Sequence, residues 1–538
     1  MIVQNLQLPE IPDRLYIRAS DRDIKLQKKN MGVYAQGEVA FTTYYNSFAL
    51  KKWKKYTDIG TVSLALTAKG RFEVTLLGFE ILHGLKAVWN MQKNSFVKRT
   101  LDKKTFSVQE TTECEIVYPE CECELLAFTI RAFEHSELYG GAYCTSIDEE
   151  SLPEVNLALA ICAYKREQYI KANMAMLNET IFSNNHSILN DHVRVYIADN
   201  GQTLKKEEIE SETIKLFPNI NSGGSGGFSR CMIEALADKD RYNLTHIVLM
   251  DDDIFFTHDV IARTYTFLRL LRKEHSNIVI SGAMIRMDTP HIQHTSGEMI
   301  KPAEIVQHKH GYDLTTIRAI VLNEIEKPIN YCAWWYCCFR LEDTLRANLA
   351  LPLFFQYDDT DWGLRNKGLE KVVVSGICVR HETFDAKRTG WKDYYSIRNR
   401  LVVATRHRDS AFRGCGKLYF QAHIFIKILH RIVFFRFNDA ELMMKAVEDY
   451  CRGMEWLGSV DPAAVLQDVQ RYAAKDVQKS VFTGIRLTVR LLRLVWSFGL
   501  QFKKIAAQYH ENYHQYITEA FWRSYLGLQE EGVQTSGI

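Results

Sequence analysis

The sequence lacks the marks of three classes of protein. Its 67 basic and 65 acidic side chains nearly cancel, so the net charge of +2 gives no sign of the strongly basic surface that nucleic-acid binding needs. No stretch of about 18 uncharged apolar residues occurs, so we expect no membrane-spanning helix. The first residues contain no basic segment followed by an apolar core, so we expect no signal peptide.

The cysteines show no pattern typical of metal knuckles or of a disulfide framework. None of the twelve falls in a Cys-x-x-Cys pair, and Cys121/Cys123 and Cys337/Cys338 are too close together to suggest either. Reduced thiols in a cytoplasmic protein are the simplest interpretation. With 46% apolar and 25% charged residues, the chain is predicted to be globular, with about two to four domains.

The sequence predicts three regions. Residues 1–152 contain short alternating runs, such as 61–68 and 72–77 on either side of a predicted turn at 69–71, which indicates a β-sandwich. Strand and helix patterns alternate over residues 153–405, which indicates an α/β domain with an open, mostly parallel sheet. Residues 406–538 are predicted to be helical.

Three polar segments follow predicted strands of the central region. Ligands of open parallel sheets bind at the carboxyl ends of the strands. Asp251, Asp252 and Asp253 directly follow an apolar run and would repel one another there. A divalent cation carrying a phosphorylated substrate would relieve this repulsion, and a solvated acidic turn is the alternative. The other two segments are Tyr164-Lys-Arg166 and Asp199-Asn200.

His381 ends a β-branched run, residues 371–379, which is predicted to be another strand. Neutral imidazole binds Mn²⁺-type ions alongside carboxylates. A purely structural histidine is the alternative. We expect His381 to be a ligand together with Asp251 and Asp253, because two carboxylates would supply too few ligands.

A glycine-rich segment opens a predicted helix at residues 221–230, beginning Asn221-Ser-Gly223-Gly224. Glycines let backbone N–H groups approach a diphosphate closely, and a helix N-terminus favours anions. The segment lacks the lysine of a phosphate-binding P-loop. A flexible turn is the alternative to ligand contact.

A second acidic cluster, Asp358, Asp359 and Asp361, follows an apolar run. A carboxylate beside an acceptor hydroxyl can act as a general base. The alternative is an N-cap on a helix predicted to begin at Asp361. Trp334 and Trp335 offer aromatic surface to a sugar, although burial in the core explains such a pair equally well.

Residues 480–504 are predicted to form a helix with Arg486, Arg490 and Arg493 on one face. Another face carries Leu487, Leu491, Leu494, Val495 and Phe498. Such a helix could lie in a membrane interface, or pack on the sheet domain or on another subunit.

In their order and spacing, these motifs resemble the bacterial galactofuranosyltransferases of glycosyltransferase family 2. The resemblance covers about residues 155–405. It is carried by Ala163-Tyr-Lys-Arg166, the glycine-rich segment, Met250-Asp-Asp-Asp253, Gly297-Glu298, Trp334-Trp335, Tyr357-Asp-Asp-Thr-Asp-Trp-Gly363, His381 and Ile397-Arg-Asn-Arg-Leu-Val-Val.

The resemblance implies a GT-A nucleotide-sugar domain between the β-sandwich and the helices, and a role for each motif residue. Asp359 would be the catalytic base. Asp251, Asp253 and His381 would hold Mn²⁺ or Mg²⁺. The UDP-sugar would contact Arg166, Asn221, Gly223, Gly224, Asp251 and Asp252. The acceptor would contact Trp334, Trp335, Glu298 and Asp358.

The implied reaction is an inverting transfer of galactofuranose from UDP-galactofuranose to a glycan or lipid-linked glycan at the cytoplasmic membrane face. Ser396 stands where the family has a histidine, so donor contacts there are expected to differ. Two other functions stay open: a non-catalytic carbohydrate-binding scaffold and a sugar nucleotidyltransferase. The sequence does not decide between a monomer and a homo-oligomer.

Overall fold

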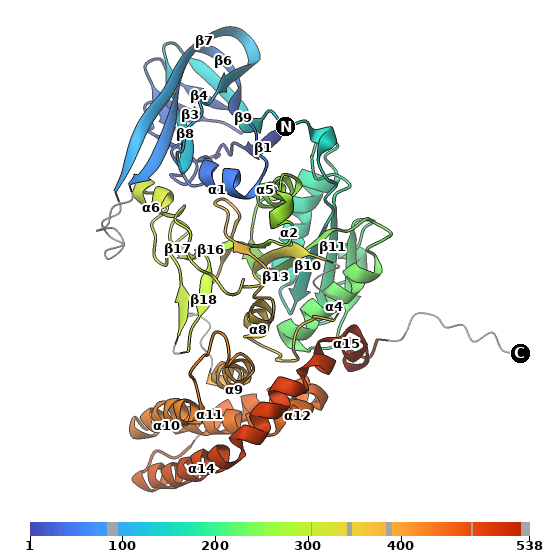
Figure 1. The fold of residues 1–538 in the computed structure, drawn as a ribbon. Coiled ribbons are helices and arrows are strands. Elements are labelled where there is room, and N and C mark those ends of the chain that lie inside the picture. Colours follow the sequence, from blue (N-terminus) through green and yellow to red (C-terminus); the bar gives the residue numbers. More distant parts are fainter. Residues whose placement is uncertain are drawn as a thin grey trace, which may run out of the picture.

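The computed structural model describes residues 1–28, 30–82, 95–302, 304–341, 347–383, 390–474 and 477–528. Figure 1 shows a β-rich N-terminal region, a central α/β region and a C-terminal set of helices at the far end of the molecule from the N-terminal strands. None of the twelve cysteines forms a disulfide. Among the described residues, no helix has the length and apolar content needed to cross a bilayer.

The N-terminal region is an antiparallel sheet that closes into a nearly complete barrel or sandwich, which confirms the predicted β-rich architecture. The strand order is β2-β5-β8-β6-β9-β4-β3, with β1 beside β9 and β7 beside β6. Its elements are β1 (Ile2–Asn5), β2 (Arg18–Ala19), β3 (Ile24–Leu26), β4 (Met31–Val33), β5 (Glu38–Ala40), α1 (Leu50–Tyr56), β6 (Val62–Leu82), β7 (Ser95–Val117), β8 (Leu125–Ala132) and β9 (Ser136–Thr145).

The turn predicted at residues 69–71 is wrong. Strand β6 continues through these residues and pairs with β7 on both sides of them, with a register shift between Ala68 and Gly70. Gly70 has a φ of 113°, which only glycine adopts readily. A β-bulge needs the same glycine as a turn but bends the strand without ending it.

The central region is built on a seven-stranded sheet in the order β12-β11-β10-β13-β20-β15-β21. Only β20 is antiparallel to its neighbours, so the predicted mostly parallel sheet is confirmed. The strands are β10 (Leu157–Ala163), β11 (Val193–Asp199), β12 (Ile214–Pro218), β13 (His246–Asp251), β15 (Val279–Ser281), β20 (Tyr336–Arg340) and β21 (Lys371–Val372).

Helices cover both faces of this sheet. Alternate residues of β10 enter different cores, with Leu159 in one and Ala160 in the other. Side chains of α2 and α5 share the first core, and side chains of α4 share the second. Burial on both faces explains the nearly continuous apolar runs of these strands. The helices of the region are α2 (Glu167–Leu177), α3 (Lys206–Ile209), α4 (Gly223–Ala237), α5 (His258–Arg269), α6 (Ile317–Leu322) and α8 (Asp358–Arg365).

A second sheet, in the order β14-β22-β16-β17, lies beside the first. The run 371–379, predicted to be one strand, is divided between the two sheets: β21 ends at Val372, and β22 begins at Cys378 after a turn at Gly376, whose φ is 84°. The strands are β14 (Ile254–Phe255), β16 (Ala283–Arg286), β17 (Gln293–Thr295) and β22 (Cys378–His381), and β18 (Glu298–Ile300) forms a separate hairpin with β19 (Ile305–Gln307).

The C-terminal region is helical, as predicted, and α10, α11 and α14 lie together in it (Figure 1). The helix predicted at 480–504 begins at Val481, where the Ser480 side chain accepts the Thr483 N–H, and it extends to Glu511. The helices are α9 (Gly390–Arg406), α10 (Lys417–Val433), α11 (Phe437–Tyr450), α12 (Gly453–Ser459), α13 (Pro462–Ala473), α14 (Val481–Glu511) and α15 (Glu519–Tyr525).

Candidate active site

Strands β13, β14 and β22 bring the three predicted metal ligands together. β13 ends at Asp251, and Asp253 directly precedes β14. In β22, His381 pairs with Ile254 of β14, which places the imidazole beside the aspartates. One possible ligand atom from each of Asp251, Asp253 and His381 lies within 4.8 Å of the others.

The donor set of this group fits a hard divalent cation. His381 Nε2 lies 2.9 Å from Asp253 Oδ1 and 3.8 Å from Asp251 Oδ2. On the other side of the ring, Nδ1 lies 2.5 Å from the carbonyl oxygen of Glu382, which can only accept a hydrogen bond. Nδ1 therefore carries a proton, and Nε2 faces the carboxylates. Two carboxylates and an imidazole could hold Mn²⁺ or Mg²⁺.

Arg166 and Asp252 flank this group. Arg166, at the start of α2, is partly exposed and has a guanidinium nitrogen 3.6 Å from Asp253 Oδ2. Asp252 lies outside the three-residue group and accepts the Tyr164 N–H at 2.7 Å. Burial, opposed by that hydrogen bond and reinforced by Asp253 and Asp251, raises the pKa of Asp252 to about 7.

The glycine-rich segment is the first part of a helix that packs tightly against another loop. Gly223 begins α4 with a φ of 67°, and a Cβ there would lie 1.9 Å from the Phe354 carbonyl oxygen. A Cβ on Gly224 would lie 3.2 Å from Asp358 Oδ2. Asn221 Oδ1 accepts the Gly223 N–H at 3.3 Å. The glycines thus place the N-terminus of α4 against residues 354–358.

Helix α8 begins at Asp358, so the predicted start at Asp361 is wrong. Tyr357 is the N-cap residue, in the left-handed conformation with a φ of 68°. Asp361 is fully buried and pairs with Arg365 at 2.8 Å, with His407 at 2.9 Å and with Arg406. The Arg406 and Arg365 guanidiniums overcome burial and hold the pKa of Asp361 well below its usual range.

Asp358 and Asp359 have carboxylates rather than cations as electrostatic neighbours. Burial raises the pKa of Asp358, and burial followed by the charges of Asp358 and Glu298 raises the pKa of Asp359. Burial also raises the pKa of Glu298, in β18, to about 7. Asp358 Oδ2 accepts the Ser225 hydroxyl of α4 at 3.2 Å. In the described part of the chain, no basic side chain forms an ion pair with Asp358 or Asp359.

The two acidic clusters meet around the carboxyl end of β10. The charges of Asp252, Asp251 and Asp358 each raise the pKa of the Cys162 thiol, beyond the effect of burial. Asn200 Nδ2 contacts the Gly223 carbonyl at 2.9 Å and the Cys162 sulfur at 3.4 Å. The ends of β10, β11 and β13 and the first turns of α4 and α8 therefore share one edge of the sheet.

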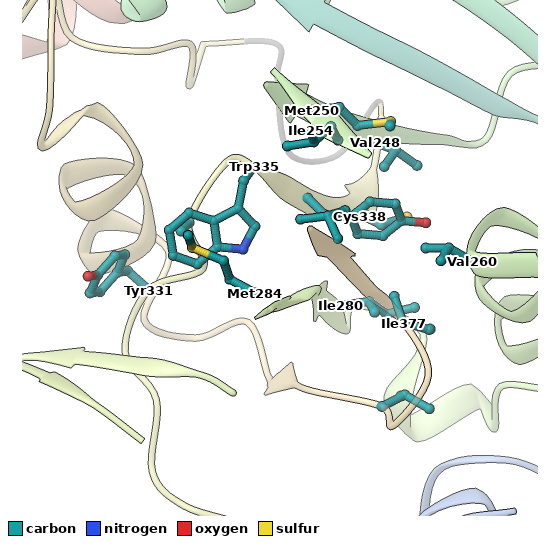
Figure 2. Close-up of a cluster of buried hydrophobic side chains, with 14 of the residues drawn as sticks. Val248, Met250, Ile254, Val260, Ile280, Met284, Tyr331, Trp335, Cys338 and Ile377 are labelled. Atoms are coloured by element: carbon teal, nitrogen blue, oxygen red, sulfur yellow. The ribbon is translucent and has the colours of Figure 1, made fainter. Parts of the chain in front are cut away.

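Trp334 and Trp335 are both buried. Trp334 packs edge-on against Phe228 at 5.3 Å between ring centroids. The Trp335 indole donates to the Gly282 carbonyl at 3.0 Å, and Figure 2 shows it beside Met284 in the core. Contact of either ring with an acceptor stays a prediction.

The sequence analysis did not predict which side chains would lie beside Glu298 and Tyr357. The Tyr331 hydroxyl and the Gln307 amide lie close enough to Glu298 to oppose the rise that burial causes in its pKa. Ser396 and Arg400, both in α9, lie close enough to Tyr357, directly before α8, to oppose the rise that burial causes in its pKa. These partners come from distant segments. The sequence pointed to two of them, Ser396 by its departure from the family motif and Arg400 as part of the motif at residues 397–403.

Comparisons with known proteins show which proteins this chain resembles. The model of the family "Galactofuranosyltransferase 2 N-terminal" matches residues 12–104. The protein "Galactofuranosyltransferase GlfT2" of Mycolicibacterium smegmatis is 23% identical over 509 residues, which cover 88% of this chain and 73% of that protein. GlfT2 of Mycobacterium tuberculosis is 25% identical over 470 residues, which cover 82% of this chain and 69% of that protein.

A solved structure gives no further guidance. The CBM22-1–GH10 modules of xylanase 10B from Clostridium thermocellum align with 41% of this chain and 41% of that chain, at 11% identity and a TM-score of 0.17. A score this low carries no inference about the fold.

The fold and the site define an α/β protein with glycosyltransferase homology and a group of residues that could hold a metal. More particularly, the chain is a distant homologue of mycobacterial GlfT2 over most of its length.

Proposed function

We propose that the protein is a metal-dependent, inverting galactofuranosyltransferase that uses UDP-galactofuranose. The observation that carries the proposal is the meeting, at one sheet edge, of a metal-type group and an acidic cluster with no basic partner among the described residues. Distant homology to GlfT2 supports the choice of reaction and of donor. We assign residues 153–405 to a GT-A domain, flanked by domains at 1–152 and 406–538.

The donor end of the site lies at Asp251, Asp253 and His381. These residues would hold Mn²⁺ or Mg²⁺, which supplies charge neutralisation to a leaving diphosphate. Arg166 lies beside Asp253 and is suited to contact the nucleotide. The remaining proposed donor contacts are Asn221, Gly223, Gly224 and Asp252.

Asp359 is the proposed general base. It accepts the proton of an acceptor hydroxyl while that oxygen forms a bond to the anomeric carbon and the bond from this carbon to UDP breaks. Attack from the face opposite UDP inverts the configuration. Burial and neighbouring carboxylates raise the pKa of Asp359, which makes it a stronger base than an exposed aspartate. Glu298, Asp358, Trp334 and Trp335 form the proposed acceptor side.

A donor screen tests the proposal. Purified protein with Mn²⁺ and a galactofuranose-terminated glycan is offered several UDP-sugars, including both ring forms of UDP-galactose, and UDP release is measured. We expect release that depends on metal and acceptor and is greatest with UDP-galactofuranose, and a product of inverted configuration by NMR.

Two rival outcomes would contradict it. A carbohydrate-binding scaffold would bind the glycan and release no UDP from any donor. A sugar nucleotidyltransferase would release pyrophosphate from UTP and a sugar phosphate instead.

A further inference from the structure

A polar pocket lies between helix α1 of the N-terminal region and the central region (Figure 1). Its volume of about 390 Å³ is within the range of small-molecule sites. Side chains of α1, residues 326–329 and residues 371–373 form its wall, together with Ser296 and Lys309. None of the residues proposed for the donor, the general base or the acceptor lines it, so this pocket is distinct from the candidate active site.

Positive charge predominates in the wall of this pocket, which we call the lysine pocket. Among the described residues that line it, the carboxylate is Glu326, and the lysines are Lys52, Lys309, Lys327 and Lys371. Glu326 is already paired, because Lys55 of α1 lies 2.5 Å from it and the Tyr56 hydroxyl donates to it at 2.8 Å. A cavity lined by an excess of one charge attracts ligands of the opposite charge, so the lysine pocket is suited to an anion.

The positive charge converges on Lys309. Burial and the charge of Lys52 lower the pKa of Lys309 to about 7, Lys327 acts in the same direction, and Glu324 and Glu326 oppose them. Lys52 and Lys327 affect Lys309 in this way because their ammonium groups lie near its own. A doubly charged anion between the three would relieve their mutual repulsion.

The protein itself does not neutralise Lys309. Glu324 pairs with Lys52 at 3.0 Å, and in the described part of the chain no carboxylate forms an ion pair with Lys309. Its ammonium group donates to the Asn323 carbonyl instead. The Lys309 backbone has a φ of 57°, in the left-handed region that lysine rarely adopts. Such strained positions cluster at ligand-binding sites.

Another part of the wall is apolar. Pro328, Ile329, Val372 and Val373 contribute side chains without polar atoms. Small-molecule sites usually combine such an apolar surface with a few polar groups that fix the orientation of the ligand. The lysine pocket therefore offers contacts to an organic group as well as to an anion.

We propose that the lysine pocket binds a small phosphorylated metabolite, with its phosphate between Lys52, Lys309 and Lys327 and its organic part against the apolar wall. Lysine binds phosphate as a point charge that needs no fixed geometry. Three converging lysines match a phosphate dianion better than a single carboxylate, which carries one charge.

The lysine pocket is joined to the acceptor side of the proposed active site. Ser296 of its wall lies two residues before Glu298. Between them, Gly297 has a φ of 93°, and a Cβ there would lie 2.6 Å from Ile329 Cγ2, in another part of the wall. The neighbouring Asn330 N–H donates to the Glu298 carbonyl at 3.3 Å. An anion that fixes this wall should therefore help to fix Glu298 and tighten acceptor binding. This consequence rests on the proposed function, whereas anion binding itself does not.

Calorimetry of the full chain with inorganic phosphate and EDTA tests anion binding without a metal or a sugar. We expect one saturable site. Lys309→Met and Lys327→Met each remove a cation and keep the length of the side chain, so each should weaken binding by about tenfold or more. The matched control Lys301→Met changes an exposed lysine between β18 and β19, outside the pocket, and should bind like the unaltered chain.

The unfolding temperature separates loss of the site from loss of the fold. Phosphate should raise it in the unaltered chain and in Lys301→Met, because a ligand of the folded state stabilises that state. Lys309→Met and Lys327→Met should unfold cooperatively without this rise. Absence of phosphate binding by the unaltered chain, or equal binding by all these chains, would disprove the proposal. Binding that both pocket variants keep and Arg166→Met loses would place the phosphate at the donor end instead.

A panel of sugar phosphates and glycerol phosphate tests the apolar part of the pocket. We expect at least one of them to bind more tightly than inorganic phosphate. Val373→Ser should weaken that organic phosphate and leave inorganic phosphate unchanged. If no member of the panel exceeds inorganic phosphate, the organic part of the proposal is wrong.

The pH dependence of sulfate binding tests the role of Lys309, because sulfate stays doubly charged from about pH 8 to about pH 6. Lys309 gains its charge as the pH falls through its pKa of about 7, so the affinity for sulfate should rise over this range. Lys309→Met should abolish the rise. The ring of His308 contacts the Pro328 carbonyl at 2.8 Å, and His308→Asn should keep the rise. The reverse result would assign the effect to His308 and overturn the role of Lys309.

Kinetics with a water-soluble acceptor test the link to Glu298. Sulfate replaces phosphate in this assay because it binds Mn²⁺ only weakly. We expect sulfate to lower the KM for the acceptor by about fivefold or more in the unaltered chain and in Lys301→Met, and to have no such effect in Lys327→Met. Mn²⁺-dependent UDP binding should be the same with and without sulfate.

Failure of the pocket and failure of the proposed function give different results. A chain that releases UDP but binds neither phosphate nor sulfate would overturn the pocket proposal alone. A chain whose phosphate binding depends on Lys309 and Lys327 but that releases no UDP from any donor would overturn the enzymatic proposal alone. Sulfate binding with an unchanged KM for the acceptor would overturn the link between the pocket and Glu298.

Discussion

Asp359 and Asp361 lie two residues apart on helix α8 and have opposite surroundings. Asp361 meets Arg365, Arg406 and His407, which hold its pKa well below the usual range. Asp359 meets Asp358 and Glu298, and its pKa is raised. Burial alone therefore does not mark a functional acid. An acid whose charge is balanced within the protein stabilises the fold, and one that is left unbalanced is available to a substrate.

The largest expected effect on turnover comes from Asp359→Asn. The amide keeps the shape of the side chain but cannot accept the acceptor proton, so we expect kcat to fall by about 10²- to 10⁴-fold. Since Asp359 lies outside the metal-type group, Mn²⁺-dependent UDP binding should be unchanged by calorimetry. Near-normal turnover would show that another group is the base.

Asp361→Asn should lower the stability of the fold more than it lowers turnover. It leaves Arg406 and His407 buried beside a neutral amide, so we expect the free energy of unfolding to fall by about 3–5 kcal/mol, measured with urea. Turnover per folded molecule should change less than in Asp359→Asn. An equally stable Asp361→Asn chain with lost turnover would reverse the roles assigned to the two residues.

A third change tests whether Asp251, Asp253 and His381 hold a cation. His381→Ala removes one possible ligand. Loss of a residue that merely supports a metal ligand costs about 10- to 100-fold in metal affinity, so we expect His381→Ala to weaken Mn²⁺-dependent UDP binding by at least as much. Calorimetry with Mn²⁺ and with EDTA measures this change. The control His186→Ala changes an exposed loop residue. UDP binding that ignores both EDTA and His381→Ala would exclude a metal at this group.

The parts of this comparison that depend on local sequence could be predicted. Apolar runs specify β10, β11 and β13, and the carboxyl ends of parallel strands meet at one edge of a sheet. The sequence therefore predicted that Asp251 and Asp253 lie near the residues that follow β10 and β11. The helix α14 was also predicted from local sequence, through its helical period. Periodicity alone does not tell which apolar side of the helix is buried against the protein.

The parts that depend on distant pairing could not be predicted. Asp361 is a structural acid because α9 and the residue after it supply Arg406 and His407, which no local pattern connects with α8. His381 reaches Asp253 because β22 leaves the sheet of β21 and pairs with β14. Gly70 was predicted as a turn because a bulge requires the same left-handed glycine.

The smallest expected effect is on the pH dependence of the rate, and it sharpens the difference between the two acids. A general base works only when ionised, so the rate falls as the pH drops through its pKa. Because the pKa of Asp359 is raised, the acid limb of kcat/KM should lie above the pH of about 4 of an ordinary carboxylate. Glu298→Gln removes a like charge and should move this limb to lower pH, while Arg406→Gln, which acts on Asp361, should leave its position unchanged. An acid limb that stays in place in Glu298→Gln would show that the base does not sense Glu298 and is therefore not Asp359.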